Sequence, residues 1–231
     1  MVELVRSGDR RALARLITAI ESSDPAADLV VAELVEMDHV ARRIGITGPP
    51  GAGKSTLVNA IIAELRARDE SVAVLAVDPS SPITGGALLG DRIRMQDHVD
   101  DPGVYIRSMA SRGHLGGLAH AAAPTIAALA RAGFDLVLVE TVGVGQSEVE
   151  VMDLVDVVVL VLGPGWGDQI QANKAGILEI TDVFVINKGD RPGVDTVHRA
   201  LQESLGDAQT PILITTAITG EGVPELVDAI R

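Results

Sequence analysis

From residue 41 onward, short apolar runs alternate with stretches of helical periodicity, and this alternation constrains the fold more than any other feature. The runs are apolar on both faces, so strands formed by them need cover on both sides. The expected strands are residues 43–47, 72–77, 104–109, 136–140, 157–162, 183–187 and 212–215. The expected helices between them are residues 54–68, 118–132, 169–180, 196–205 and 223–230. The pattern predicts a three-layer α/β domain with a mostly parallel central sheet.

The first 40 residues show helical periodicity only. Apolar residues recur at helical spacing at Leu13, Leu16, Ile17 and Ile20. Ser7 or Asp9 is available as the cap of this helix. Asp24 and Pro25 resemble a cap followed by a first-turn proline, which predicts a second helix toward Met37. We therefore expect a short N-terminal helical extension over residues 1–40 and one domain over residues 41–231.

Charge and composition exclude several classes of function. The net charge is 19 − 32 = −13, which disfavours binding to nucleic acid or to anionic membranes. The chain has no cysteine, which excludes disulfides, iron–sulfur clusters and thiolate zinc sites. Its strongest apolar run, residues 157–162, has the length of a strand, and the N-terminus lacks an apolar signal region. We therefore expect a cytoplasmic protein.

A glycine-rich loop separates the first expected strand of the domain from the helix that follows. Residues 48–55 read GPPGAGKS, which fits the phosphate-binding pattern G-x-x-x-x-G-K-[ST]. The glycines allow close approach of the backbone to phosphates, and the helix N-terminus attracts anions. Lys54 should reach the β- and γ-phosphates, and the Ser55 hydroxyl should bind Mg²⁺. The predicted nucleotide contacts are Gly48, Pro49, Pro50, Gly51, Ala52, Gly53, Lys54, Ser55 and Thr56.

A second motif indicates which base is bound. Residues 187–190 read NKGD at the end of an expected strand, where ligands bind in open α/β sheets. The spacing N-K-x-D is the guanine-recognition signature of GTPases. Asp190 offers two acceptor oxygens to the N1–H and amino donors of guanine, which adenine lacks. We expect Asn187 and Lys188 to brace the loop, and a later loop to contact guanine through Thr216, Ala217 and Ile218.

Carboxylates at strand ends suggest a magnesium site. Glu140 ends an expected strand and begins E-x-x-G, where ordinary GTPases have D-x-x-G. Asp78 ends another strand, and Asp91 lies in a glycine-rich stretch. Helix capping by Asp78 and a surface position for Asp91 are the structural alternatives. The expected magnesium ligands are Ser55, Asp78, Asp91 and Glu140.

These segments together resemble the MeaB/ArgK family of GTPases, within the wider group that includes HypB-like metallochaperones. The segments that carry the resemblance are GDRRALARLI at 8–17, GPPGAGKST at 48–56, VDPSSPITGGALLGDRIRM at 77–95, ETVGVGQSE at 140–148 and GDQIQANKAGILEITDVFVINKGDRPG at 167–193. The resemblance covers nearly the whole chain. It implies a P-loop NTPase G domain over residues 41–231.

The resemblance also implies a function. Members of the family are GTPases that chaperone an adenosylcobalamin-dependent acyl-CoA mutase, such as methylmalonyl-CoA or isobutyryl-CoA mutase. They gate cobalamin loading by GTP hydrolysis and protect the mutase from inactivation. The implied cofactors are GTP or GDP and Mg²⁺. Lys174 matches a lysine of the partner-responsive loop at 163–177, so the implied catalytic residues are Lys54, Glu140 and Lys174.

Two other functions remain open at this point. A HypB-like metal-insertion GTPase would need His or Cys ligands near the nucleotide, and the sequence contains no cysteine. An ArgK-type transport-linked ATPase or kinase conflicts with Asp190, which matches guanine.

Family members form homodimers through a helical arm after the last helix of the domain. This sequence ends at Arg231, so we expect any homodimer to lack the usual arm.

Overall fold

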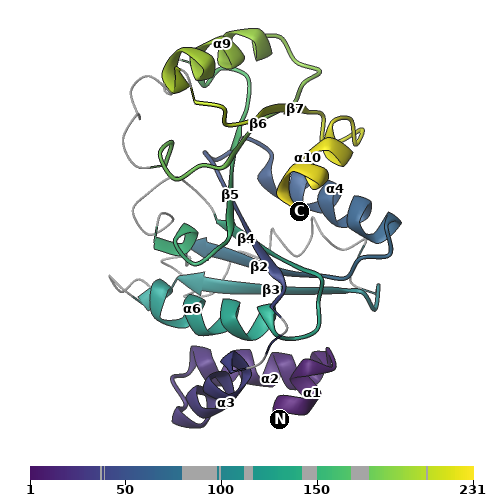
Figure 1. Cartoon of the computed structure of the whole chain (residues 1–231), viewed down its shortest axis with the longest axis vertical. Coiled ribbons are helices and arrows are strands. Elements are labelled where there is room, and N and C mark those ends of the chain that lie inside the picture. Colours follow the sequence, from purple (N-terminus) through teal and green to yellow (C-terminus); the bar gives the residue numbers. More distant parts are fainter. Residues whose placement is uncertain are drawn as a thin grey trace.

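The computed structural model of the chain describes residues 1–36, 38, 40–79, 98, 100–111, 117–141, 150–167, 177–206 and 208–231. Within these ranges, seven strands form one sheet in the order β3-β2-β4-β1-β5-β6-β7, and neighbouring strands are parallel. The strands are β1 (Arg42–Thr47), β2 (Val72–Pro79), β3 (Val104–Ser111), β4 (Leu136–Thr141), β5 (Val157–Leu162), β6 (Val183–Asn187) and β7 (Ile212–Thr215). This arrangement confirms the predicted α/β fold (Figure 1).

The strands are buried as their composition predicts. Every residue of β4, β5 and β6 is buried, because helices and loops cover both faces of the sheet. The bounds of β5, β6 and β7 match the expected ranges, and the other four strands extend slightly beyond them. β1 lies between β4 and β5, so the chain passes from one side of β1 to the other. Such a reversal of strand order is where open α/β sheets bind ligands.

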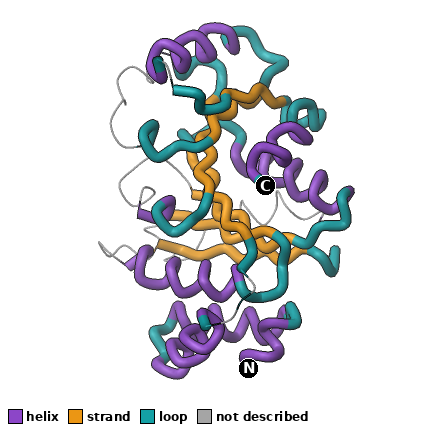
Figure 2. Tube along the Cα trace, viewed as in Figure 1, coloured by secondary structure: helices purple, strands orange, loops and turns teal. Residues whose placement is uncertain are grey.

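Two separate apolar clusters cover the two faces of the sheet. On one face, α4 (Lys54–Ala67) and α10 (Val223–Ile230) contribute Leu57, Ile61, Leu226 and Val227 to a buried cluster. On the other face, α6 (Gly117–Ala130) and α9 (Val194–Leu205) contribute to the second cluster. Figure 2 shows these helices flanking the strands. Among the described residues, no helix combines the length and apolar character required to cross a membrane.

The N-terminal segment forms a layer of helices on the outer side of α6. It contains α1 (Val2–Arg6), α2 (Arg10–Glu21) and α3 (Pro25–Val35), and both α2 and α3 contact α6 (Figure 1). Asp9 caps α2 by accepting a hydrogen bond from the backbone N–H of Ala12, so it is the cap among the two expected candidates. Asp24 caps α3, with Pro25 in its first turn, as the sequence predicts.

One expected helix differs from the structure at its C-terminal end. Residues 177–180, which the sequence places in a helix over 169–180, form turns; residues 168–176 lie outside the described ranges. The Thr181 hydroxyl donates to the carbonyl of Ile177, and Asp182 accepts a hydrogen bond from the N–H of Val158 in β5. These side-chain contacts compete with helical hydrogen bonds and lead the chain into β6.

Candidate nucleotide-binding site

The candidate site lies at the carboxyl edge of the sheet, where β1, β4, β6 and β7 end. Because these strands are parallel, the residues that follow them emerge on one side of the molecule. Three described loops meet there: the phosphate loop at 48–53, the loop at 188–193 and the loop at 216–222. The fold therefore brings together motifs that are far apart in the sequence.

Two glycines of the phosphate loop meet steric requirements. Gly48 has φ 144°, and a Cβ atom there would lie 2.1 Å from the carbonyl oxygen of Val161 in β5. Gly53 has φ 95°, and a Cβ atom there would lie 2.5 Å from Nδ2 of Asn187. Gly53 is also the N-cap of α4, and it provides no side-chain cap. The N-terminus of α4 carries the positive end of the helix dipole, which makes this helix end suitable for an anion.

Lys54 lies within the phosphate loop. Its side chain is buried, and Nζ donates to the carbonyl oxygens of Gly48 at 2.7 Å and Pro49 at 3.1 Å. These carbonyl acceptors compensate the ammonium group for the loss of water. The positive charge is thus already fixed beside the helix N-terminus.

Ser55 and Glu140 form a buried pair whose oxygen atoms could act as metal ligands. The Ser55 hydroxyl donates to Oε1 of Glu140 at 2.7 Å, and the residues are 7% and 2% exposed. Glu140 lies opposite Ile46 in the register of β1 and β4, which brings its carboxylate beside the start of α4. Mg²⁺ prefers hydroxyl and carboxylate oxygens, so this donor set fits that ion.

The other predicted acids, Asp78 and Asp91, and Lys174 lie partly or wholly outside the described residues. The backbone of Asp78 lies in β2, which pairs with β4, so Asp78 and Glu140 lie on neighbouring strands at the same edge. The position of the Asp78 side chain is outside what the structure describes. Asp91 and Lys174 also fall outside the described residues.

Asn187 joins the three loops. The residue is 2% exposed, and its Nδ2 donates to the carbonyl oxygens of Ala52 at 3.1 Å and Gly53 at 3.3 Å. Its Oδ1 accepts from the Thr215 hydroxyl and from the N–H of Ala217, each at 3.2 Å. One buried amide therefore sets the phosphate loop relative to the loop after β7.

The remaining residues of the NKGD motif lie around Asn187. Lys188 has φ 63°, and its Nζ donates to the carbonyl of Gly51 at 2.6 Å. The Gly189 N–H donates to the carbonyl of Thr215 at 2.9 Å. Asp190 is exposed, so its carboxylate is accessible to a ligand. Thr215 was not predicted as a site residue, and its contact with Asn187 depends on β6 pairing with β7.

A pocket of about 530 Å³ opens beside the loop at 216–222. It lies between one side of α4 and the turn at 217–220. Three of the predicted nucleotide contacts line it, namely Thr56, Ala217 and Ile218. Ile218 is 84% exposed, so it is accessible at the mouth of the site.

The ion pairs with shifted pKa values lie at the opposite edge of the sheet. A hydrogen bond from Arg43, at the start of β1, lowers the pKa of Asp156, just before β5. A hydrogen bond from Arg66 lowers the pKa of Asp101, and the backbone N–H of Gly103 lowers it further. These pairs join segments of the scaffold away from the site.

The chain is similar in sequence to several GTPases. Residues 13–231 match the family described as methylmalonyl Co-A mutase-associated GTPase MeaB. A putative GTPase of Pyrococcus horikoshii is 49% identical, over 100% of this chain and 76% of that protein. GTPase ArgK of Escherichia coli is 38% identical, over 99% of this chain and 73% of that protein. The mitochondrial methylmalonic aciduria type A homolog of Caenorhabditis elegans is 41% identical, over 80% of this chain and 50% of that protein.

Two solved structures have a fold similar to that of this chain. A crystal structure of a LAO/AO transport system kinase superposes with a TM-score of 0.76 at 31% identity, over 99% of this chain and 72% of that one. The hydrogenase maturation factor HypB from Archaeoglobus fulgidus superposes with a TM-score of 0.63 over 96% of this chain and 98% of that one. At 17% identity, the likeness to HypB concerns the fold alone. The match over residues 13–231, together with these relatives, shows that the chain belongs to the MeaB family of GTPases, which confirms the resemblance indicated by its motifs.

Proposed function

We propose that this protein binds guanine nucleotides with Mg²⁺, hydrolyses GTP, and thereby gates cobalamin loading of an adenosylcobalamin-dependent acyl-CoA mutase. The observation that carries the nucleotide part is the buried side chain of Asn187, which contacts the phosphate loop and the loop after β7 at once. Through these hydrogen bonds, one side chain would hold a phosphate site and a base site in a fixed relative position.

At the phosphate end, the residues act mainly by position and charge. The first-turn N–H groups of α4 and the Lys54 ammonium would donate to phosphate oxygens, with Lys54 exchanging its contacts to Gly48 and Pro49 for the nucleotide. Ser55 and Glu140 would hold the ion, with Asp78 and Asp91 as further candidates. An ion held by these residues would offset the negative charge of the phosphates.

At the base end, Asp190 selects guanine. Its carboxylate would accept hydrogen bonds from N1–H and from the amino group of guanine, while backbone groups of residues 216–218 contact the other edge of the ring. Adenine would leave the acceptors of Asp190 without donors. A site built in this way rejects the wrong ligand by about 10⁴-fold.

The mutase part of the proposal is supported by family membership. The family description names an association with methylmalonyl Co-A mutase, and the Caenorhabditis elegans relative is named for methylmalonic aciduria. GTPases whose charge-stabilising group arrives with a partner have slow intrinsic turnover. We propose that the mutase accelerates GTP hydrolysis here, and that Lys174 responds to its binding.

The first test is a calorimetric titration with GDP, GTP and ATP in the presence of Mg²⁺. We expect binding of GDP at micromolar concentration or tighter, and binding of ATP far weaker. Asp190→Asn should shift the preference from guanine toward xanthine nucleotides, because the amide can donate to the second carbonyl of xanthine. Tighter binding of ATP by the native chain would instead support a transport-linked ATPase or kinase.

The second test addresses the partner. We expect an adenosylcobalamin-dependent acyl-CoA mutase from the source cell to copurify with the protein and to raise its rate of GTP hydrolysis. Lys174→Ala should reduce this stimulation and leave the basal rate unchanged. Equal loss of the basal and stimulated rates would refute the role of Lys174 in the response.

A further inference from the structure

Ala217, the first residue of the turn at 217–220, belongs to the same buried cluster as Leu57 and Ile61 of α4. Beyond Ala217, the pocket of about 530 Å³ lies between the two, with Thr56 and Ala63 on the side of α4 and Ile218 and Gly220 on the side of the turn. Protein interiors fix distances through dense packing, and such packing is missing in this space. The amide of Asn187 holds the N–H of Ala217, so the position of the outer part of the turn relative to α4 is set by this amide together with contacts made elsewhere.

The loop at 216–222 and the start of α10 form one rigid unit. The N–H of Thr216 donates to the carbonyl of Glu221 at 2.9 Å, and the N–H of Gly220 donates to the carbonyl of Thr216 at 3.0 Å. Gly222, the N-cap of α10, has φ 74°, and a Cβ atom there would lie 2.1 Å from the carbonyl oxygen of Ile214. A displacement of α10 would therefore displace the loop.

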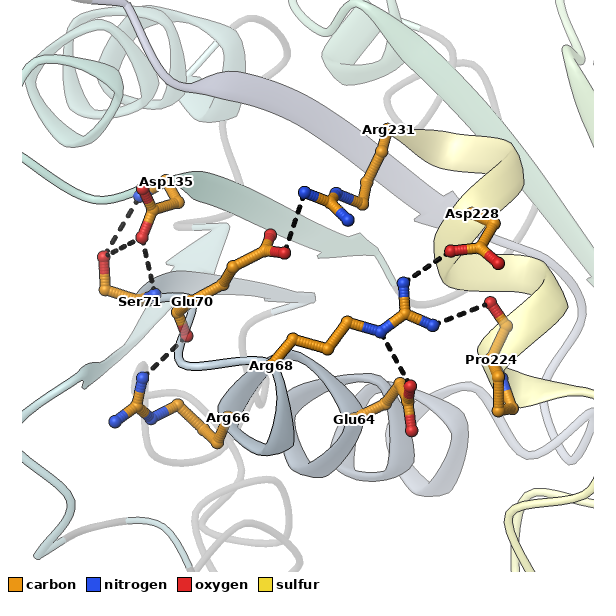
Figure 3. Close-up of polar contacts among 9 residues, drawn as sticks. All are labelled: Glu64, Arg66, Arg68, Glu70, Ser71, Asp135, Pro224, Asp228 and Arg231. Carbon is orange, nitrogen blue, oxygen red and sulfur yellow. Dashed lines mark hydrogen bonds and ion pairs between the residues drawn. The ribbon is translucent and has the colours of Figure 1, made fainter.

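Arg68 connects this unit to α4. It is the C-cap of α4, and its guanidinium donates to the Pro224 carbonyl at 3.3 Å and to the Asp228 carboxylate, both in α10 (Figure 3). Its Nε donates to Oε1 of Glu64 at 2.7 Å, which orients the guanidinium from its own helix. The Arg68 side chain is 24% exposed, so the contacts are partly shielded from water.

The polar contacts of Arg68 restrict the sliding of α10 along α4, which the apolar contacts leave free. Leu57 and Ile61 of α4 share a buried cluster with Leu226 and Ile230 of α10, and this burial holds the helices together. Hydrophobic burial is non-directional, so it resists separation more than sliding. A forked guanidinium bound to two successive turns of α10 fixes the position of α10 along α4.

We propose that Arg68 is a positioning residue for guanine recognition: by fixing α10 along α4, it places the backbone of residues 216–218 against the C6 oxygen of the base. This inference rests on the proposed function and goes beyond it, because Arg68 lies at the opposite end of α4 from the phosphate loop. Its loss should weaken contacts to the base edge and leave the phosphate contacts of Lys54 in place.

The test compares two nucleotides on the full chain. Arg68→Met keeps the aliphatic stem and removes the fork, and affinities for GDP and 6-thioguanosine diphosphate are measured by calorimetry. The thio analogue keeps the N1–H and amino donors, but its C6 sulfur is a weak acceptor. We expect Arg68→Met to weaken GDP binding by about three- to tenfold, the equivalent of one hydrogen bond. The affinity for the thio analogue should stay nearly unchanged.

Arg66→Met is the matched control. Arg66 lies in the last turn of the same helix and is also 24% exposed, but its carboxylate partner is Asp101 rather than a residue of α10. We expect both affinities of this variant to equal those of the native chain. Asp228→Asn weakens the Arg68 contact with a milder change, so it should reproduce the GDP-selective loss with smaller size, and it carries the test if Arg68→Met does not fold.

The outcomes separate the inference from the proposed function. A native chain that binds no GDP would overturn the proposed function, and the role of Arg68 with it. If the native chain binds GDP and the variants weaken both nucleotides equally, or neither, the positioning role is refuted while guanine binding stands.

Discussion

The two ends of α4 are built in opposite ways. At the N-terminal end, Gly53 provides no side-chain cap, and Lys54 and Ser55 are buried against backbone carbonyls and Glu140. At the C-terminal end, Arg66 forms an ion pair with Asp101. Figure 3 shows Arg66 in contact with the carbonyl of Glu70 and Arg68 paired with the carboxylates of Glu64 and Asp228. The first end keeps donors and charge ready for a ligand, whereas the second attaches the helix to the scaffold.

The comparison teaches how one helix serves both binding and stability. The contacts at the N-terminal end join groups that a phosphate or a cation can replace, so they can be exchanged on binding. The contacts at the C-terminal end are partly exposed ion pairs, which individually contribute little to stability. These pairs connect the end of α4 to Asp101, in the segment before β3, and to Asp228 of α10.

The largest expected effect comes from removing the charge at the N-terminal end. Lys54→Ala should weaken GDP binding by about a hundredfold or more, since charged hydrogen bonds contribute about 1.5–3 kcal/mol each. Calorimetry measures the change, with Arg66→Met at the other end of the helix as the control. If Lys54→Ala bound GDP as tightly as the native chain, the charge at the N-terminal end of α4 would have no role in ligand binding.

The next effect tests the amide that holds the N-terminal end in place. Asn187→Ala leaves the buried carbonyl of Ala52, the N–H of Ala217 and the hydroxyl of Thr215 without this partner. We expect the free energy of unfolding to fall by about 2 kcal/mol, the cost of leaving buried polar groups unsatisfied.

Urea denaturation of the nucleotide-free chain measures the stability of Asn187→Ala, and calorimetry measures its GDP affinity. Because Asn187 joins two loops of the site, GDP binding should weaken in the same variant. Lower stability with unchanged GDP affinity would limit Asn187 to a structural role.

The smallest effect is expected at the C-terminal end and depends on pH. The hydrogen bond from Arg66 holds the pKa of Asp101 below its usual value, with a further contribution from the N–H of Gly103. The carboxylate therefore contributes stability that is complete above its unfolded pKa of about 4 and is lost as the pH falls through the lowered folded pKa. Arg66→Met should be slightly less stable than the native chain at neutral pH, and the difference should shrink in acid.

Urea titrations of the native chain and Arg66→Met across this acidic range measure the difference in stability. The expected change is small because Asp101 and Arg66 are partly exposed to solvent. A difference that grew as the pH fell would contradict the sign of the Asp101 shift. GDP binding at neutral pH should be the same in both proteins.

Local sequence signals predicted the strands better than the helix ends. β5 and β6 were predicted in full because their residues are buried on both faces, which leaves a continuous apolar signal. Both Ser7 and Asp9 suit a helix cap by composition, and only the position of the Ala12 N–H distinguishes them. The expected helix ending at 180 was wrong at residues 177–180. Just after them, Asp182 accepts a hydrogen bond from the N–H of Val158, a residue that is distant in sequence.

By itself, the sequence determined the order of the strands, the helices that became α4, α6, α9 and α10, and the positions of the G-x-x-x-x-G-K-S and N-K-x-D motifs, since these depend on local periodicity and on fixed spacing of residue types. Only the tertiary structure decided that Asn187 contacts Ala52 and Gly53 and that Arg68 contacts α10. These contacts depend on β5 lying between β1 and β6 in the sheet and on α4 packing against α10. Such neighbours are chosen by the burial of the whole core, which no short stretch of sequence specifies.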